Sequence, residues 1–292
     1  MASGVETLHQ RVERRPSLDT LVEIRSGRGH ASLQELREIY RFREVLSAFV
    51  IRLVKVKYKQ AAIGFGWSFL QPIASAALFA LFMGRFAKLS SEGVPYILFA
   101  LCGTACWSYF STALTNAMES VVREASLIRK VYFPRELLPL SSVLAALVDF
   151  APAVLTVLVA SVIQGTTPGI EWLALPLSLL ILALTALGLG LGLSGLNVYY
   201  RDFRYALPFL VQMGLFASPV VYSLATVPAR WRTPYAILNP VAASIDGVRR
   251  EVLHHQWPSL TITGGALLWS LLLVLGGYAL FKRLERGFAD RA

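Results

Sequence analysis

The sequence predicts an all-α, polytopic membrane protein with six transmembrane helices, and three observations support this fold class. Of the 292 residues, 55% are hydrophobic and 16% are charged, which is too apolar for a soluble domain of this size. Several apolar runs reach the roughly 20 residues that an α-helix needs to cross a bilayer. Lys and Arg are concentrated in alternate connections between these runs, as expected when those connections face the cytoplasm.

The apolar runs define a transmembrane domain at residues 63–285. Most of the 28 Lys and Arg residues lie on one side when both termini are placed in the cytoplasm, so we predict that orientation. The net charge of +10 is then attracted by anionic lipid head groups, and nucleic-acid binding is not needed to explain it. The expected spans are residues 67–86, 94–115, 137–163, 172–197, 205–225 and 260–281.

The two ends of the chain lie outside these spans. Residues 1–31 mix Arg, Glu, Ser and Gly without an apolar centre, so they do not resemble a secretory signal peptide. We expect a flexible cytoplasmic leader there. Residues 286–292 are expected to form a cytoplasmic tail.

Residues 32–62 have the pattern of an amphipathic helix. Ser32 and Glu35 have the spacing of a capping box, and apolar residues then recur at steps of three and four. Lys and Arg occupy the opposite side, which favours a helix lying in the cytoplasmic interface of the membrane. A soluble helix that packs on a partner protein remains an alternative.

The segment from Ser126 to Pro139 is a short, basic and aromatic connection between the second and third spans. Phe133 precedes a proline and is therefore biased out of the helical region, while Pro134 suits a first helical position. One helix should end and the next begin here. A solvated loop that only orients the protein is the alternative, because Arg and Lys beside membrane spans are common.

Aromatic residues recur along the expected spans. Phe79, Phe82 and Phe86 follow one another at near-helical steps, and the ordinary interpretation is packing against lipid or neighbouring helices. The sharper hypothesis is that some rings line a passage for a sugar, whose C–H faces stack on aromatic rings. The candidate channel residues are Phe79, Phe82, Phe86, Trp107, Phe110, Phe216 and Tyr222.

Asp149 lies in the middle of an expected span. An exposed charge there costs roughly 3 kcal/mol on insertion scales, so the carboxylate should face protein or water. A structural hydrogen bond or ion pair, a role in the transport pathway or gate, and a wrongly placed span are all compatible with this position. Trp231 and Tyr235, in the long connection before the last span, are further gate candidates, and Asn239-Pro240 predicts a helix start there.

The glycines, cysteines and histidines of the chain indicate helix packing rather than a catalytic or metal site. Gly188 and Gly192 form a small-xxx-small surface for close helix packing. We interpret Cys102 and Cys106 as buried thiols rather than a metal site or disulfide, and His254 with His255 as interfacial residues. No metal site is expected. The glycine-rich run lacks the Lys-Ser or Lys-Thr of a phosphate-binding loop.

Five sequence blocks together resemble a known family, the membrane subunits of type-2 ABC exporters for polysaccharides. These permeases serve O-antigen, capsule, teichoic acid and galactan export, and the resemblance covers roughly residues 33–285. The blocks are Lys55–Lys59 with Ile63–Pro72, Ile128–Pro139, Asn197–Phe203, Ser218–Tyr222 and Leu238–Pro240.

The resemblance implies a homodimer that carries a lipid-linked polysaccharide across the bacterial cytoplasmic (inner) membrane, in contact with membrane lipids. It also implies cytoplasmic coupling helices that bind two copies of a separate ABC ATPase, and external gate helices between the fifth and sixth spans. ATP and Mg²⁺ would be bound by that ATPase, with no cofactor and no catalytic residue in this chain. By this analogy the coupling residues are Glu119, Arg123, Leu127, Ile128, Arg129, Lys130, Tyr132, Phe133, Arg201 and Asp202.

Three other functions would require different sequence features. A drug or small-lipid exporter of the same superfamily would have a closed apolar cavity instead of a continuous aromatic channel. A membrane-embedded glycosyltransferase would need carboxylates or a metal site at the membrane surface, and the spans offer only Asp149. A pure scaffold protein would not need an intramembrane aspartate.

Overall fold

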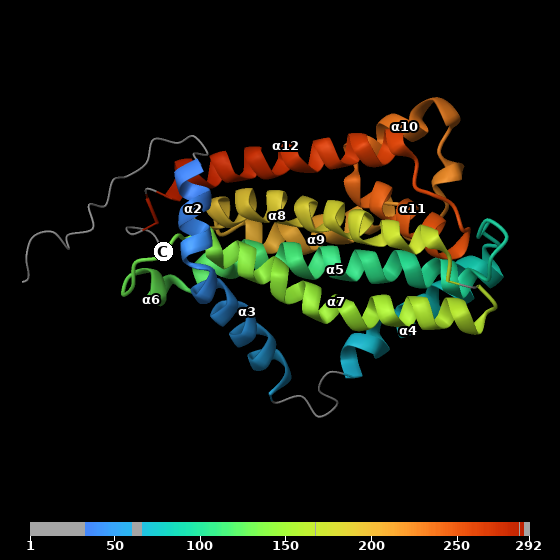
Figure 1. Cartoon of the computed structure of the whole chain (residues 1–292), viewed down its shortest axis with the longest axis horizontal. Helices are drawn as coiled ribbons and strands as arrows, with labels where there is room; N and C mark the ends of the chain where they lie inside the picture. Colours follow the sequence, from blue (N-terminus) through green and yellow to red (C-terminus); the bar gives the residue numbers. More distant parts are fainter. Residues whose placement is uncertain (1–32, 60–65, 167, 286, 289–292) are drawn as a thin grey trace, which may run out of the picture. The chain divides into compact units, whose positions relative to one another are not determined.

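The computed structural model describes residues 33–59, 66–166, 168–285 and 287–288, all within the compact unit Ala31–Ala292. These described residues form helices and no strand. Ser32 of the predicted capping box and the leader, residues 1–31, lie outside them. The elements are α2 (Leu33–Arg41), α3 (Arg43–Tyr58), α4 (Trp67–Phe79), η3 (Ala80–Phe86), α5 (Tyr96–Arg123), α6 (Ala125–Ile128), α7 (Leu137–Ile163), η4 (Ile170–Ala174), α8 (Leu175–Tyr199), α9 (Phe203–Ala217), η5 (Leu224–Thr226), α10 (Ala229–Leu238), α11 (Pro240–Leu253) and α12 (Leu260–Glu285), as Figure 1 shows.

Within the part of the chain that the structure describes, five helical segments are long and apolar enough to cross a membrane. The predicted class, an all-helical polytopic membrane protein, is confirmed. The segments are Trp67–Phe86, Tyr96–Arg123, Leu137–Ile163, Ile170–Tyr199 and Leu260–Glu285.

The expected fifth span, residues 205–225, is a shorter apolar helix in the structure. Helix α9 has 15 residues and reaches about 22 Å, less than the roughly 30 Å of a bilayer core. It ends at Ala217 because Ser218 precedes Pro219 and takes an extended conformation. The remaining predicted residues form a turn and the start of η5.

Helix α5 is the most buried of the five long segments and packs against α7, α8 and α4. Helix α8 packs along α12, and small residues let their backbones approach. A Cβ atom at Gly188 would lie 2.5 Å from the carbonyl carbon of Leu273, and one at Gly277 would meet the carbonyl oxygen of Gly188. The predicted use of Gly188 and Gly192 in close helix packing is therefore confirmed within the chain, since Gly192 also lies against Gly277.

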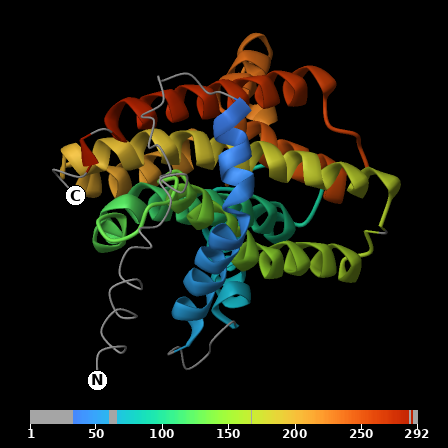
Figure 2. The ribbon, with the colours of Figure 1, turned by 60° about the vertical axis from the view of Figure 1, so that its left-hand side comes forward.

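The predicted helix over residues 32–62 consists of two helices, α2 and α3, with Phe42 between them in a non-helical conformation. Helix α3 packs on α7. Figures 1 and 2 show that α2 and α3 are steeply inclined to α5, α7, α8 and α12, which run alongside one another.

Candidate functional site

The connection from α5 to α7 is fixed to the helices α2 and α3. Phe133 is only 6% exposed, and its ring packs edge-on against Phe49, with 5.4 Å between the ring centroids. Leu137 and Leu138, at the start of α7, are buried in the same cluster. The side chains that pack around this buried group are Ile39, Phe42, Val45, Leu46, Phe49, Leu127 and Ile128.

Helix α7 has the bounds of the predicted span 137–163, but Pro134 does not have its predicted place in it. The helix begins at Leu137, and Pro134 lies in the turn before it. The carbonyl oxygen of Pro134 accepts a hydrogen bond from the amide of Leu137 at 3.1 Å. Pro134 is therefore not at the first helical position. Its fixed φ angle still ends the extended stretch in a turn that leads into the helix.

A charged cluster holds the other side of this connection to α12. The ammonium of Lys282 lies 3.0 Å from a carboxylate oxygen of Glu136 and 3.0 Å from one of Glu285. Arg135 donates a hydrogen bond of 2.8 Å to the carbonyl oxygen of Glu285. Burial raises the pKa of Glu136, and the nearby Lys282 opposes that shift. The connection is thus held by apolar packing against α2 and α3 on one side and by ion pairs with α12 on the other.

Between these anchors lies the exposed turn, Arg129–Tyr132. Arg129 and Lys130 are exposed, and Val131 and Tyr132 expose 55% and 57% of their surface. The hydroxyl of Tyr132 lies 3.3 Å from a carboxylate oxygen of Glu38 in α2 and donates to it. Cations and a half-exposed aromatic side chain are therefore presented on a rigid base.

The remaining coupling candidates are distributed over several environments. Leu127 and Ile128 are half-buried in the packing under the turn, and Glu119 is half-buried on α5. Arg201 and Asp202 are exposed between α8 and α9. The two connections lie at the same end of the helices, because Ile128 and Tyr199 contact one hydrophobic cluster around Phe281 and Phe288.

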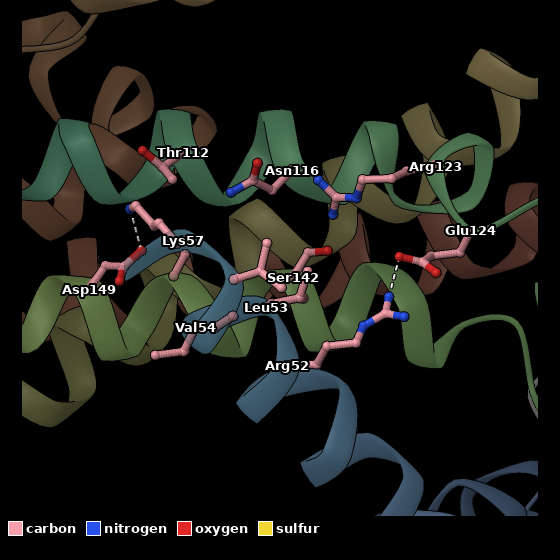
Figure 3. A pocket seen from close by; sticks show the side chains of 13 residues that line it. Arg52, Leu53, Val54, Lys57, Thr112, Asn116, Arg123, Glu124, Ser142 and Asp149 are labelled. Atoms are coloured by element: carbon pink, nitrogen blue, oxygen red, sulfur yellow. Dashed lines mark hydrogen bonds and ion pairs between the residues drawn. The ribbon is translucent and has the colours of Figure 1, made fainter. Parts of the chain in front are cut away.

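Arg123 instead lines a pocket of about 590 Å³ between α3, α5 and α7 (Figure 3). Two ion pairs span this pocket. The ammonium of Lys57 lies 2.6 Å from a carboxylate oxygen of Asp149, and the guanidinium of Arg52 pairs with the carboxylate of Glu124. These pairs attach α3 to the end of α5 and to the middle of α7.

The structure places Asp149 in that pocket, where the Tyr58 hydroxyl also donates to it. Burial and this hydrogen bond raise the pKa of Tyr58 to about 12. The expectation that Asp149 faces protein or water is met, and the ion pair with Lys57 shows its structural partner. A role in the pathway stays a prediction.

At the opposite end of the long helices, Arg249 on α11 organises the connection that follows α9. Its guanidinium is buried and donates to the carbonyl oxygens of Pro219 at 2.7 Å and Val220 at 2.6 Å. It also donates to those of Phe99 and Tyr222, at 3.1 Å each. Burial lowers the pKa of Arg249 to about 10.

The gate candidates lie around this connection. Tyr235 donates to the carbonyl oxygen of Ala217 at 2.6 Å, and its hydroxyl lies 3.3 Å from that of Tyr222. Trp231 is 58% exposed. The predicted start of a helix at Asn239-Pro240 is confirmed, since Asn239 accepts from the amide of Ala242 at 3.3 Å and α11 begins at Pro240.

The seven channel candidates do not form one surface within the chain. Trp107 and Phe110 are buried in the core, 5.4 Å apart between centroids, and Phe79 is packed against that core. Phe82, Phe86 and Phe216 are more than half exposed, and Tyr222 is half-buried. Only the exposed rings are available to line a passage.

Several important residues were not singled out from the sequence. Arg249 and Glu251 of α11 are charged but buried, and neither was named in the sequence analysis. Arg52 and Glu124 are 72 positions apart, and no local pattern indicates their pairing.

No group of three or more His, Cys, Asp or Glu residues suited to a metal ion occurs among the described residues. Cys102 and Cys106 are free, buried thiols, as interpreted from the sequence. His254 lies 3.2 Å from a carboxylate oxygen of Glu92, and His255 lies 4.0 Å from one of Glu171. Each histidine therefore has its own carboxylate.

Comparison with known proteins gives one consistent group of matches. The model of the ABC-2 type transporter family matches residues 44–252, from α3 to α11. The O-antigen export system permease protein RfbA of Myxococcus xanthus is 26% identical over 256 residues, covering 87% of this chain and 98% of that protein. Two Klebsiella pneumoniae proteins of the same name are 27% and 25% identical, each over 81% of this chain and 90% of the relative.

Proposed function

Because this chain belongs to the ABC-2 type transporter family, we propose that it is the membrane permease of an ATP-driven exporter of a lipid-linked polysaccharide. Membership of this family implies that the chain acts together with an ABC ATPase. The chain has no Gly-x-x-x-x-Gly-Lys-Ser or -Thr segment, so ATP is hydrolysed by that separate chain. ATP and Mg²⁺ are bound there, in two ATPase copies, and this chain carries no cofactor.

The observation that supports coupling best is the exposed turn, Arg129–Tyr132, on its clamped base. A surface that transmits movement must be accessible to the partner and rigidly joined to the helices that move. Phe133 and Leu137 pack the base against α3, and Glu136 ties it to Lys282 of α12. Arg201 and Asp202 provide a second exposed connection at the same end.

The membrane topology proposed from the charge pattern places this end in the cytoplasm of a bacterial inner membrane. Six crossings follow when α9 and the connection after it together serve as the fifth. That connection is backed by Arg249, so its non-helical carbonyl groups are hydrogen-bonded inside protein, as a membrane requires. Helices α10 and α11 then form the external gate elements between the fifth and sixth crossings.

The proposed substrate and oligomer rest on the relatives and on the exposed aromatic residues. The matched relatives are named O-antigen export permeases. Phe82, Phe86 and Phe216 expose their rings, and in a homodimer such rings could stack against sugars along a continuous path. A drug or small-lipid exporter would instead use a closed apolar cavity, whereas the pocket between α3, α5 and α7 has five charged side chains in its lining.

The test of this function is ATPase activity of the chain purified with its ATPase, with and without lipid-linked glycan. Lys130→Glu and Tyr132→Asp change exposed side chains of the turn that are not part of the apolar cluster beneath it, and Tyr132→Asp also removes the hydrogen bond to Glu38. An Ile128 variant would be less clear, because Ile128 is part of that packing. Arg283→Glu, at the end of α12, is the control, since Arg283 is exposed outside the turn.

The turn variants should keep membrane insertion and ATPase binding in the control range but lose glycan stimulation. Unchanged stimulation in both variants would contradict coupling through this turn. If no ATPase co-purifies with the native chain, the exporter function itself is wrong.

A further inference from the structure

The pocket between α3, α5 and α7 has features that attachment of α3 does not require. Its volume of about 590 Å³ corresponds to many water molecules, each with about 30 Å³ in the liquid. Small side chains create this space on α7, where Ser142, Ala145 and Ala146 share one face with Asp149. A purely structural ion-pair site needs no such room.

The charges of the pocket do not cancel. Arg52 and Lys57 are each paired with a carboxylate, those of Glu124 and Asp149. Arg123 is a third cation in the lining, and no ion pair or hydrogen bond of its side chain occurs within the described ranges. One positive charge is therefore left over.

The surplus cation is accessible, and neutral polar side chains lie on the same face of its helix. Arg123 is exposed, and Figure 3 shows its guanidinium directed along α5 toward Asn116. Thr112, Asn116 and Arg123 are spaced by four and seven residues, so they share one face of α5. The side chains of Thr112 and Asn116 make no hydrogen bond to another described residue. A planar guanidinium directed toward an amide donor suits the oxygens of a phosphate group, whereas Thr112 is about 16 Å from Arg123 along the helix and lies too far away to share that phosphate.

The wall that α3 contributes to the pocket combines aliphatic and cationic side chains. Leu53, Val54 and Val56 line the pocket together with Arg52 and Lys57. The pocket therefore presents an aliphatic surface next to a cationic end, close to where α5 ends and α7 begins. An amphiphile with a phosphate head and an aliphatic chain matches both surfaces, whereas inorganic phosphate matches only one.

We propose that this pocket binds a phosphate group, with Arg123 as its main ligand and Asn116 and Arg52 beside it. The phosphate belongs to the head group of a membrane lipid or is free phosphate, and the aliphatic wall favours the lipid. Binding next to Arg52 competes with Glu124 for that guanidinium. The proposal concerns the chain alone and does not depend on polysaccharide export.

The test measures lipid binding to the full purified chain by native mass spectrometry. The probes are dioleoyl phosphatidic acid and dioleoylglycerol, which have the same acyl chains with and without phosphate. Arg123→Gln removes the surplus charge, and Ala145→Leu fills the cavity while leaving every charge in place. Arg283→Gln removes one exposed charge at the end of α12, outside the pocket, and is the matched control.

The native chain should bind phosphatidic acid at least tenfold more tightly than dioleoylglycerol. Arg123→Gln and Ala145→Leu should each lose most of that preference, while Arg283→Gln keeps it; unchanged size-exclusion profiles show that the variants are folded. Equal losses in Arg283→Gln and Arg123→Gln would indicate non-specific attraction and overturn the proposal, as would full binding in Ala145→Leu.

A competition arm distinguishes the two sources of phosphate. Displacement of phosphatidic acid by an excess of inorganic phosphate would show that the phosphate alone is recognised. Retention of the lipid under the same conditions would show that head group and chains are bound together. Either result supports a phosphate site, provided that the pocket variants have lost it.

Discussion

The guanidinium of Arg249 lies over the ring of Phe99, 3.5 Å from its centroid, and donates to the carbonyl oxygen of the same residue. The two residues are 150 positions apart. Through this contact α11 is joined to the start of α5, while the other guanidinium hydrogens bind the chain after α9. A single buried cation thus holds together three separate segments.

Arg249→Met should strongly destabilise the protein. The substitution keeps an aliphatic stem but leaves the carbonyl oxygens of Phe99, Pro219 and Val220 without their donor. Hydrogen bonds to a charged group contribute about 1.5–3 kcal/mol each, so we expect a loss of at least about 3 kcal/mol. Thermal unfolding of the purified chain measures this as a lower midpoint or as loss of folded protein.

The control is Arg250→Met, because Arg250 is adjacent but pairs only with Asp246 one turn away on the same helix. Its side chain is about one-third exposed, and such pairs contribute less than about 1 kcal/mol. Similar losses in the two variants would mean that the carbonyl contacts of Arg249 are not the cause.

The crossing of α8 and α12 predicts opposite results for two neighbouring glycines. In Gly277→Ala the new Cβ meets the backbone carbonyl of Gly188, which cannot move without separating the helices. In Gly276→Ala the new Cβ has nothing within 4 Å. Gly277→Ala should lower the yield and the unfolding midpoint, and Gly276→Ala should leave both unchanged. Equal tolerance of the two substitutions would show that the helices are not in close contact here.

Buried Glu251 should make stability depend on pH. Its carboxylate accepts a hydrogen bond from Ser178 at 2.7 Å, while its second oxygen is buried and unpartnered in the described structure. Burial raises its pKa from 4.5 to about 7. Because the folded state holds this proton more tightly than the unfolded state, the contribution of Glu251 to stability falls as pH rises from about 4.5 through about 7.

Glu251→Gln removes this titration and keeps a similar shape. Relative to the native chain, the variant should gain stability between pH 5 and pH 8, values we choose on either side of the folded pKa. Unfolding midpoints of both chains across that range measure the difference. A constant difference across the range would show that Glu251 does not titrate in the folded state.

Local rules account for the parts of the fold that the sequence predicted well. Apolar length alone located the long helices, the spacing of Gly188 and Gly192 indicated close packing, and Asn239-Pro240 marked the start of α11. The basic, aromatic turn was also evident, since its cations interrupt two apolar runs. Each of these features lies within one short window of sequence.

Other parts depend on distant partners and could not be predicted in this way. Helix α11 has alternating charges that suggest a surface helix, but Arg249 is satisfied by carbonyl groups from Phe99 and from the residues after α9. Hydropathy extended the fifth span past Ser218, although the following proline favours an extended residue there. The sequence does not show that α3 packs on α7 and forms a pocket with α5, so the place of Arg123 in that pocket could not be predicted, and its contact with the ATPase stays a prediction.

The ion pair between Lys57 and Asp149 predicts an asymmetric response to removing either partner. The side chain of Lys57 is 52% exposed, whereas that of Asp149 is 17% exposed and belongs to a membrane-spanning helix. Lys57→Met leaves a carboxylate on that helix with only the Tyr58 hydroxyl, at a cost of up to about 3 kcal/mol. Asp149→Asn leaves an ammonium that can reach solvent or head groups and should cost less. The double variant should therefore be more stable than Lys57→Met alone, as judged by unfolding midpoints and by the fraction of monodisperse protein. If the two losses simply add, the charges do not interact in the folded chain and the attachment of α3 relies on its apolar contacts with α7.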